Sequence, residues 1–228
     1  MPKLARLSMK DRLVAALRGK ILNGELPAHS RITEQGLADE FGVSRSVVRE
    51  TMLALEIQGL LVSTPYKGTE VASVTQSEVR DFLLPVRCQI EQYALRAGLE
   101  RFDAETFDRF GAVLDTMARA VADKDVVAFN DADMDFHALI VESAGSDAAL
   151  AVWDAIQMRI RMHWSLQTGR TGPLHQFLLD HRALVEVFRT GDLERSLTAI
   201  AEHVIDSNLR HLDVLDQEDA EPDSRSAS

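Results

Sequence analysis

The sequence lacks several features that would place it in particular classes of protein. It has one cysteine, Cys88, in 228 residues, so it cannot form an internal disulfide, and a single thiol fits a reducing compartment. It has no apolar run of membrane-spanning length, and its start, "MPKLARLSMK", has too few apolar residues for an export signal. We therefore expect a cytoplasmic protein with no membrane partner.

The net charge of −11 is unevenly distributed along the chain. Residues 1–71 carry ten Lys or Arg and eight Asp or Glu, a net charge of +2, whereas residues 72–228 carry fifteen and twenty-eight, a net charge of −13. The acidic segment repels a polyanion, so any contact with DNA is expected in the first segment. Hydrophobic residues at 46% and charged residues at 27% are typical of a folded globular protein.

The first 73 residues are predicted to form a winged helix-turn-helix domain. The stretch "DRLVAALRGKILNGEL" has the apolar spacing of an amphipathic helix. A second helix is expected between Thr33, a plausible N-cap, and Gly42, a plausible C-terminal stop, and a third from Ser44 to Gly59. The stretch "LLVSTPYKGTEVAS" then predicts a two-stranded hairpin that turns near residues 66–68.

The rest of the chain predicts a bundle of helices, so the fold class is mainly α. Polar turns and glycines separate six segments of helical period, which we place near residues 77–99, 104–122, 125–143, 147–168, 173–190 and 192–215. The domain boundaries are therefore 1–73 for DNA binding, 74–215 for the helical domain and 216–228 for an acidic tail. The tail has no large apolar residues and is predicted to be disordered.

Two arginines, Arg45 and Arg49, lie one turn apart at the start of the third predicted helix. In a helix-turn-helix this end of the helix enters the major groove, where arginine binds guanine or phosphate. The alternative is a pair of solvated arginines bonded to Glu50 or Glu56. The predicted DNA-contacting residues are Ser44, Arg45, Ser46 and Arg49 on the helix and Lys67 at the hairpin tip.

The segments "LADEFGVSRSVVRE" and "LALEIQGLLVSTPYKGTEV" closely resemble the DNA-binding domain of the GntR family of bacterial transcription regulators. The resemblance covers about residues 10–72. Two positions depart from the family pattern: His29 replaces a glycine before the second helix, and Ser46-Val47 replaces a common Thr-Pro pair. The matching residues are Leu37, Ala38, Gly42, Val43, Ser44, Arg45, Val48, Arg49, Glu50, Leu55, Glu56, Gly59, Leu60 and Gly68.

Histidines accompany an acid in the helical half. Asp133 and His137 lie four residues apart and share one helix face, while His181 and His203 lie on later predicted helices. Imidazoles and a carboxylate that converge inside a bundle form a divalent metal site. The alternative is that the Asp133–His137 pair is a surface hydrogen bond and the other histidines are satisfied core residues. Spacing alone leaves both open.

The helical half is similar to the FCD effector domain of the FadR-like subgroup of GntR regulators. Asp133, His137, His181 and His203 match that subgroup's metal-binding motif in order and spacing. The resemblance implies a divalent metal, with zinc as the first choice and nickel or manganese as alternatives. It also implies a small carboxylate effector near the metal, with Arg87 as its anion partner; the alternative for Arg87 is a salt bridge to Glu91.

These observations predict a homodimeric transcriptional repressor with no catalytic residues. Two N-terminal domains would bind double-stranded DNA at a palindromic operator, and a small organic acid at the metal site would change that binding. Two alternatives remain open at this point. One is a metal-responsive repressor without an organic effector, and the other is a metal-dependent enzyme with a DNA-binding domain, since open metal positions permit catalysis.

Overall fold

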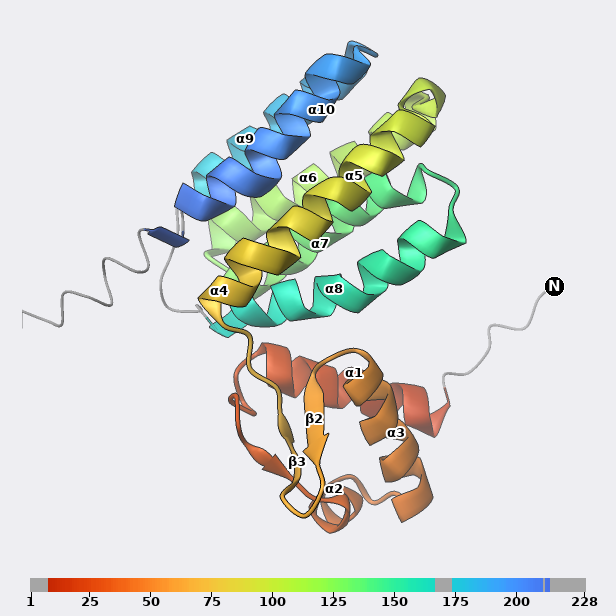
Figure 1. Cartoon of the computed structure of the whole chain (residues 1–228), viewed down its shortest axis with the longest axis vertical. Helices are drawn as coiled ribbons and strands as arrows, with labels where there is room; N and C mark the ends of the chain where they lie inside the picture. Colours follow the sequence, from red (N-terminus) through yellow and green to blue (C-terminus); the bar gives the residue numbers. More distant parts are fainter. Residues whose placement is uncertain (1–7, 167–173, 211, 214–228) are drawn as a thin grey trace, which may run out of the picture. The chain divides into compact units, whose positions relative to one another are not determined.

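The computed structural model describes residues 8–166, 174–210 and 212–213 (Figure 1). The chain packs as two compact units, Met1–Thr75 with Asp154–Thr168, and Gln76–Trp153 with Gly169–Ser228. The predicted tail at 216–228 and the predicted break at 169–173 lie outside the described residues. No helix in the described part of the chain combines the length and the apolar character needed to span a membrane.

The first unit is a winged helix-turn-helix, as predicted. Its elements are α1 (Met9–Leu22), β1 (Arg31–Ile32), α2 (Glu34–Phe41), α3 (Arg45–Ile57), β2 (Leu61–Thr64) and β3 (Gly68–Val71). The antiparallel sheet has the order β1-β3-β2, so the structure adds a third strand to the two that were expected. That strand has only two residues, too short to produce an alternating apolar pattern in the sequence.

The predicted helix caps are present. The Thr33 side chain accepts a hydrogen bond from the Gly36 amide at 3.1 Å, and Gly42 ends α2 in the left-handed conformation with φ 63°. The Ser44 side chain caps α3 by accepting from the Val47 amide. These caps fix the short turn between α2 and α3, which sets the direction in which the N-terminal end of α3 points.

His29 occupies a backbone conformation that favours glycine. Its φ is 66°, in the left-handed region, and its amide donates to the Val71 carbonyl oxygen at 2.9 Å. A histidine thus takes a backbone conformation that glycine adopts more readily, because histidine has a Cβ. The Val71 hydrogen bond holds this turn against the end of β3.

The second unit is a helical bundle with more breaks than the sequence indicated. The first predicted helix is divided into α4 (Gln76–Glu78), a π-helical segment η1 (Val79–Leu83) and α5 (Leu84–Gly98). Pro85 has no N–H to donate to the preceding turn, which is consistent with a change of helical type just before it. The remaining elements of the chain are η2 (Leu99–Arg101), α6 (Ala104–Asp123), α7 (Val126–Glu142), α8 (Asp147–Leu166), which the two units share, α9 (Leu174–Arg189), α10 (Leu193–Ala201) and the π-helical segment η3 (Glu202–Ser207).

The core of the bundle contains a group of phenylalanines from four segments. Phe110 and Phe136 have ring centroids 4.9 Å apart, and Phe102 meets Phe188 edge-to-face at 6.0 Å. Phe110, Phe136 and Phe188 are almost fully buried. Aromatic rings at these separations attract beyond the area they bury, so they fix α6, α7 and α9 against one another.

Gly98 gives a direct test of this packing. A Cβ at this position would overlap the carbonyl oxygen of Ser143, at the end of α7. We therefore expect Gly98→Ala to lower the free energy of unfolding by about 1–3 kcal/mol, because the core must shift to accept the methyl group. Chemical denaturation followed by circular dichroism measures the change.

Gly111, in α6, is the matched control. No described atom outside its own surroundings lies within 4 Å of the position of its Cβ. Gly111→Ala should therefore raise the free energy of unfolding by about 0.5–1 kcal/mol, through helix propensity alone. Equal effects of the two substitutions would contradict the close α5–α7 approach.

Candidate functional site

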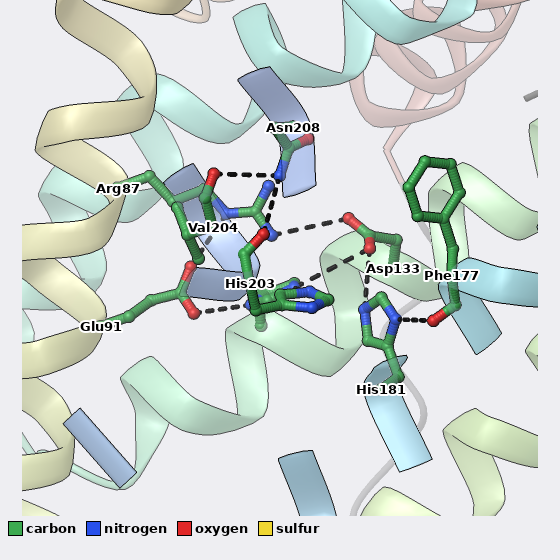
Figure 2. Close-up of polar contacts among 9 residues, drawn as sticks. Arg87, Glu91, Asp133, Phe177, His181, His203, Val204 and Asn208 are labelled. Atoms are coloured by element: carbon green, nitrogen blue, oxygen red, sulfur yellow. Dashed lines mark hydrogen bonds and ion pairs between the residues drawn. The ribbon is translucent and has the colours of Figure 1, made fainter. Parts of the chain in front are cut away.

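Four side chains that are far apart in the sequence converge inside the second unit (Figure 2). Asp133 and His137 come from α7, His181 comes from α9, and His203 comes from η3. One ligand atom from each lies within 4.8 Å of every other, and all three histidines are buried. The structure thus brings together the four residues that the sequence nominated. Asp133 and His137 are not a surface pair, because His137 is buried.

The separations of these atoms suit a metal ion. Asp133 Oδ1 lies 2.9 Å from His181 Nε2 and 3.8 Å from His137 Nε2, and the Nε2 atoms of His137 and His203 are 3.3 Å apart. When two nitrogen or oxygen atoms bind the same divalent ion at its usual bond length, these atoms lie about 3 to 3.5 Å apart. The cluster is close to that spacing, so little movement is needed to bind an ion.

Hydrogen bonds to the outer ring nitrogens orient two of the imidazoles. His181 Nδ1 donates to the Phe177 carbonyl oxygen at 2.7 Å, and His137 Nδ1 lies 2.6 Å from Glu91 Oε2, which accepts as a carboxylate. In the neutral rings, a proton on Nδ1 leaves a lone pair on Nε2. Both Nε2 lone pairs therefore point into the cluster, the arrangement that a metal-binding histidine uses.

This arrangement leaves acceptor atoms facing one another. His181 Nε2 lies 2.9 Å from Asp133 Oδ1, and with the ring proton on Nδ1 both of these atoms are acceptors. Two acceptors at this distance repel unless the ring gains a second proton or a cation lies between them. His203 Nδ1 is also buried and has no hydrogen-bond partner in the described part of the chain.

The protonation states agree with metal binding. Burial, reinforced by the Arg87 charge, lowers the pKa of His137 well below its usual value, and burial with the His181 charge does the same for the pKa of His203. Burial opposes the ionisation of Asp133, but its contacts with His181, His137 and Arg87 outweigh it and lower its pKa. At neutral pH His137 and His203 are thus neutral and Asp133 is an anion, the forms that bind a divalent metal.

Arg87 lies beside the cluster and forms a salt bridge to Glu91, which was the alternative to its role as an anion partner. Its Nε donates to Glu91 Oε1 at 2.9 Å, and its Nη2 lies 3.6 Å from Asp133 Oδ2. Its side chain is 1% exposed and that of Glu91 is fully buried. Trp153 is buried, and its ring lies 5.9 Å from the Arg87 guanidinium carbon.

Glu91 is a site residue that the sequence reading treated only as a salt-bridge partner. It joins Arg87 to His137, and burial raises its pKa to about 7 although the Arg87 charge lowers it. The available signal was its position on the buried face of α5, seven residues after Leu84 and seven before Gly98. A carboxylate on an inward face must find a partner, and His137 supplies one.

The segment that holds His203 is not a regular helix. The sequence predicted one helix over residues 192–215, whereas His203 lies in the π-helical η3, which follows α10. Asn208 Nδ2 donates to the carbonyl oxygens of His203 and Val204 at 3.3 and 3.0 Å. A π-helical turn changes the direction of the side chains that follow it, and such turns are frequent at functional sites.

In the first unit, the predicted DNA-contacting side chains are all exposed. Arg45 and Arg49 bond to the first turn of α2 rather than to Glu50 or Glu56. Arg49 Nε lies 3.0 Å from Glu34 Oε2, and Arg45 Nη2 donates to Gln35 Oε1. Exposed pairs of this kind contribute little stability, so both arginines are available to another partner.

Ser44 and Lys67 occupy different positions from the arginines. Ser44 caps α3 with its hydroxyl, so this side chain stabilises the start of that helix. Lys67 lies in the turn between β2 and β3, and its carbonyl oxygen accepts a hydrogen bond from Arg31 at 2.8 Å. The side chains of Ser46 and Lys67 are exposed.

Both units match known protein families. Residues 9–71 match the model of the bacterial regulatory proteins of the gntR family, and residues 83–206 match the model of the FCD domain. The chain belongs to the GntR family of transcriptional regulators with an FCD domain. Regulators of this family bind DNA, and FCD domains bind small-molecule effectors.

Relatives of this GntR regulator include proteins named as repressors. The probable D-xylose utilization operon transcriptional repressor of Paenarthrobacter nicotinovorans is 24% identical over 89% of this chain and 88% of its own. The gluconate operon transcriptional repressor of Bacillus licheniformis is 25% identical over 89% and 85%. The structure of E. coli McbR/YncC shares the fold with a TM-score of 0.78 at 18% identity, over 93% of this chain and 99% of its own.

The buried Arg87–Glu91 pair generates a prediction about stability. Arg87→Met leaves the Glu91 carboxylate buried without its cation, so the free energy of unfolding should fall by about 3–5 kcal/mol. The double variant Arg87→Met/Glu91→Met should lose less than the sum of the two single variants, because the pair is removed together. Urea denaturation with a chelator present measures the coupling, and strictly additive losses would contradict it.

Proposed function

We propose that this GntR regulator is a repressor whose operator binding is controlled by a small carboxylate bound at a metal ion in the FCD domain. The observation that carries the proposal is the set of facing acceptor atoms among Asp133, His137, His181 and His203. Those four residues would hold the metal. Zinc is the first choice because it accepts three imidazoles and a carboxylate, and nickel or manganese are the alternatives.

The metal would supply a positive centre that attracts the carboxylate of the effector. Arg87 is a cation of the protein beside the cluster, 3.6 Å from Asp133 and held in place by Glu91. Because Arg87 is buried and oriented, it would bind an anion with little loss of side-chain entropy. The Glu91 carboxylate keeps the His137 ring in the tautomer that presents Nε2 to the metal.

The effector is proposed to be an organic acid. A cluster with a metal ion and a buried arginine favours an anion, and a carboxylate with a neighbouring hydroxyl offers two oxygen ligands. Two relatives, in Bacillus licheniformis and E. coli, are named as repressors of gluconate and galactonate operons, and both names contain a sugar acid. Sugar acids therefore belong in the first set of compounds to test.

On the DNA side, the N-terminal end of α3 would enter the major groove. Ser46, Arg45 and Arg49 are exposed there, with Ser44 fixing the helix start and Lys67 placed to reach the flanking backbone from the wing. A homodimer would present two such helices to a palindromic operator. Effector binding would favour one arrangement of the two FCD domains and thereby change operator affinity.

The metal prediction is tested by elemental analysis of the purified protein, with thermal unfolding in the presence of carboxylic acids before and after chelation. About one metal per chain is expected, and an effector acid should stabilise only the metal-loaded form. His181→Ala and His203→Ala should lower metal content while the protein stays folded. His175→Ala is the control, because His175 is an exposed histidine on the same helix as His181.

Two results would contradict the metal proposal. Full metal content in His203→Ala would mean that the ligand set is wrong. Absence of metal in the unchanged protein, with acid-induced shifts that chelation does not alter, would mean that the four residues have a structural role. Metal-dependent operator binding with no response to any acid would instead support a metal-responsive repressor.

The DNA prediction is tested with an operator selected from random duplex DNA by the unchanged protein. Arg45→Ala and Arg49→Ala should each weaken operator binding by about 10- to 100-fold, the effect of losing one base or phosphate contact. Arg12→Ala, an exposed arginine on α1, is the control and should bind normally. Fluorescence anisotropy at fixed salt measures affinity, and wild-type binding by both arginine variants would contradict the assignment of α3.

A further inference from the structure

The second unit has a surface groove that the proposed function does not use. It lies between α9 and the segment formed by α10 and η3, which run side by side (Figure 1), and its volume is about 520 Å³. One of the residues that line it is His203, a member of the cluster of candidate metal ligands. We call it the α9–η3 groove, and its other polar lining residues are Asp180, Glu202, Asp206, Ser207 and Arg210.

The α9–η3 groove is acidic. Its lining contains three carboxylates and one guanidinium, a net charge of −2. Glu202 and Asp206 are exposed and lie four residues apart, about one turn of η3, and both line the groove. Arg210 Nη2 donates to the Ser207 hydroxyl at 2.9 Å. Carboxylates gathered in a hollow raise the local concentration of cations, so the groove favours a cation as its ligand.

His203 connects this groove with the cluster. Its ring lines the groove, and its Nε2 lies 3.3 Å from His137 Nε2 inside the cluster. The other two imidazoles are each held at Nδ1, His137 by Glu91 and His181 by the Phe177 carbonyl oxygen. His203 is only 7% exposed, yet its Nδ1 has no hydrogen-bond partner in the described part of the chain. No hydrogen bond at Nδ1 therefore opposes rotation of the His203 ring.

The cluster meets solvent at two places that differ in charge. One is at Asp133, whose side chain is 19% exposed and lies 3.6 Å from the Arg87 guanidinium. The other is at His203, in the acidic groove. Arg87 attracts the proposed carboxylate effector, whereas Glu202 and Asp206 repel it. The groove therefore suits the approach of a cation rather than that of the effector.

We propose that the α9–η3 groove is the route by which a divalent cation reaches the cluster. Glu202 and Asp206 attract the hydrated ion into the groove, and His203 is the first ligand to bind it and turns it towards the other three. The inference rests on the proposed function in one respect, that the four clustered residues hold a metal ion. A route of this kind sets how fast the metal binds and leaves, and not how tightly it is held.

Stopped-flow measurement of zinc uptake tests the role of the charges. Full-length protein stripped by a chelator is mixed with zinc, and a zinc indicator dye reports the free ion. The double variant Glu202→Gln/Asp206→Asn should bind zinc about tenfold more slowly than the unchanged protein at low salt, because the electrostatic attraction is lost. The difference should shrink as salt is added, since salt screens exposed charges. The final zinc content should not change.

Glu186→Gln/Glu194→Gln is the matched control for the charge variant. Both residues are exposed acids, on α9 and α10, and neither lines the groove. This control makes the same change in net charge, so it should take up zinc at the rate of the unchanged protein. Equal slowing by the two double variants would overturn the proposal, because net charge alone would then explain the rates.

A side chain that fills the groove tests the route independently of charge. Ala183 is exposed on α9 and lines the groove, so Ala183→Trp narrows it without removing a candidate ligand. Zinc uptake and zinc release should both slow by about fivefold, with the zinc dissociation constant unchanged, because one barrier is crossed in both directions. Leu179→Trp is the control, since Leu179 is 40% exposed on the same helix and does not line the groove.

The outcomes separate this inference from the proposed function. If the unchanged protein binds zinc and neither Glu202→Gln/Asp206→Asn nor Ala183→Trp alters the rate of uptake, the route is wrong and the metal centre stands. If these variants lower the final zinc content at an unchanged rate of uptake, the groove stabilises the bound ion, and the route is again wrong. If the unchanged protein binds no zinc, nickel or manganese, the proposed function fails and the route fails with it.

Discussion

The second unit depends on the pairing of charges that the fold removes from water. Arg87 and Glu91 are both buried on α5, and neither is tolerable there alone, because an unpaired buried ion costs several kcal/mol. Glu91 also bonds to His137 on α7, and Arg87 approaches Asp133 on the same helix. This chain of contacts fixes α5 against α7 and thereby determines where the histidine rings point.

The helix α5 serves two surfaces at once. Its inner side carries the polar groups that orient the candidate metal ligands, and its outer side lines an uncharged groove together with residues of α8. Two π-helical segments accompany these roles, η1 just before α5 and η3 at His203. A π-helical turn departs from regular α-helical hydrogen bonding and changes the directions of its side chains. At η3 the Asn208 side chain donates hydrogen bonds to the carbonyl oxygens of His203 and Val204.

The first unit combines a fixed scaffold with lightly held contact groups. Caps at Thr33 and Ser44 and the left-handed Gly42 define the turn between α2 and α3. Arg45 bonds to Gln35 and Arg49 bonds to Glu34 in exposed contacts, which a phosphate or a base can replace. A helix that reads DNA needs both properties. Its backbone must be held in a fixed position, and its side chains must be able to replace their contacts within the protein by contacts with DNA.

The sequence by itself determined the winged helix-turn-helix and the helical nature of the second unit, because apolar periodicity and caps are local signals, and the resemblance to the FCD domain nominated the four candidate ligands. Only the tertiary structure decided the partner of each polar side chain. Glu91 as the acceptor for His137, the π-helical turn at His203 and the two-residue strand β1 all depend on contacts between distant segments. A polar group needs a partner when it is buried, and which groups are buried is a property of the folded chain.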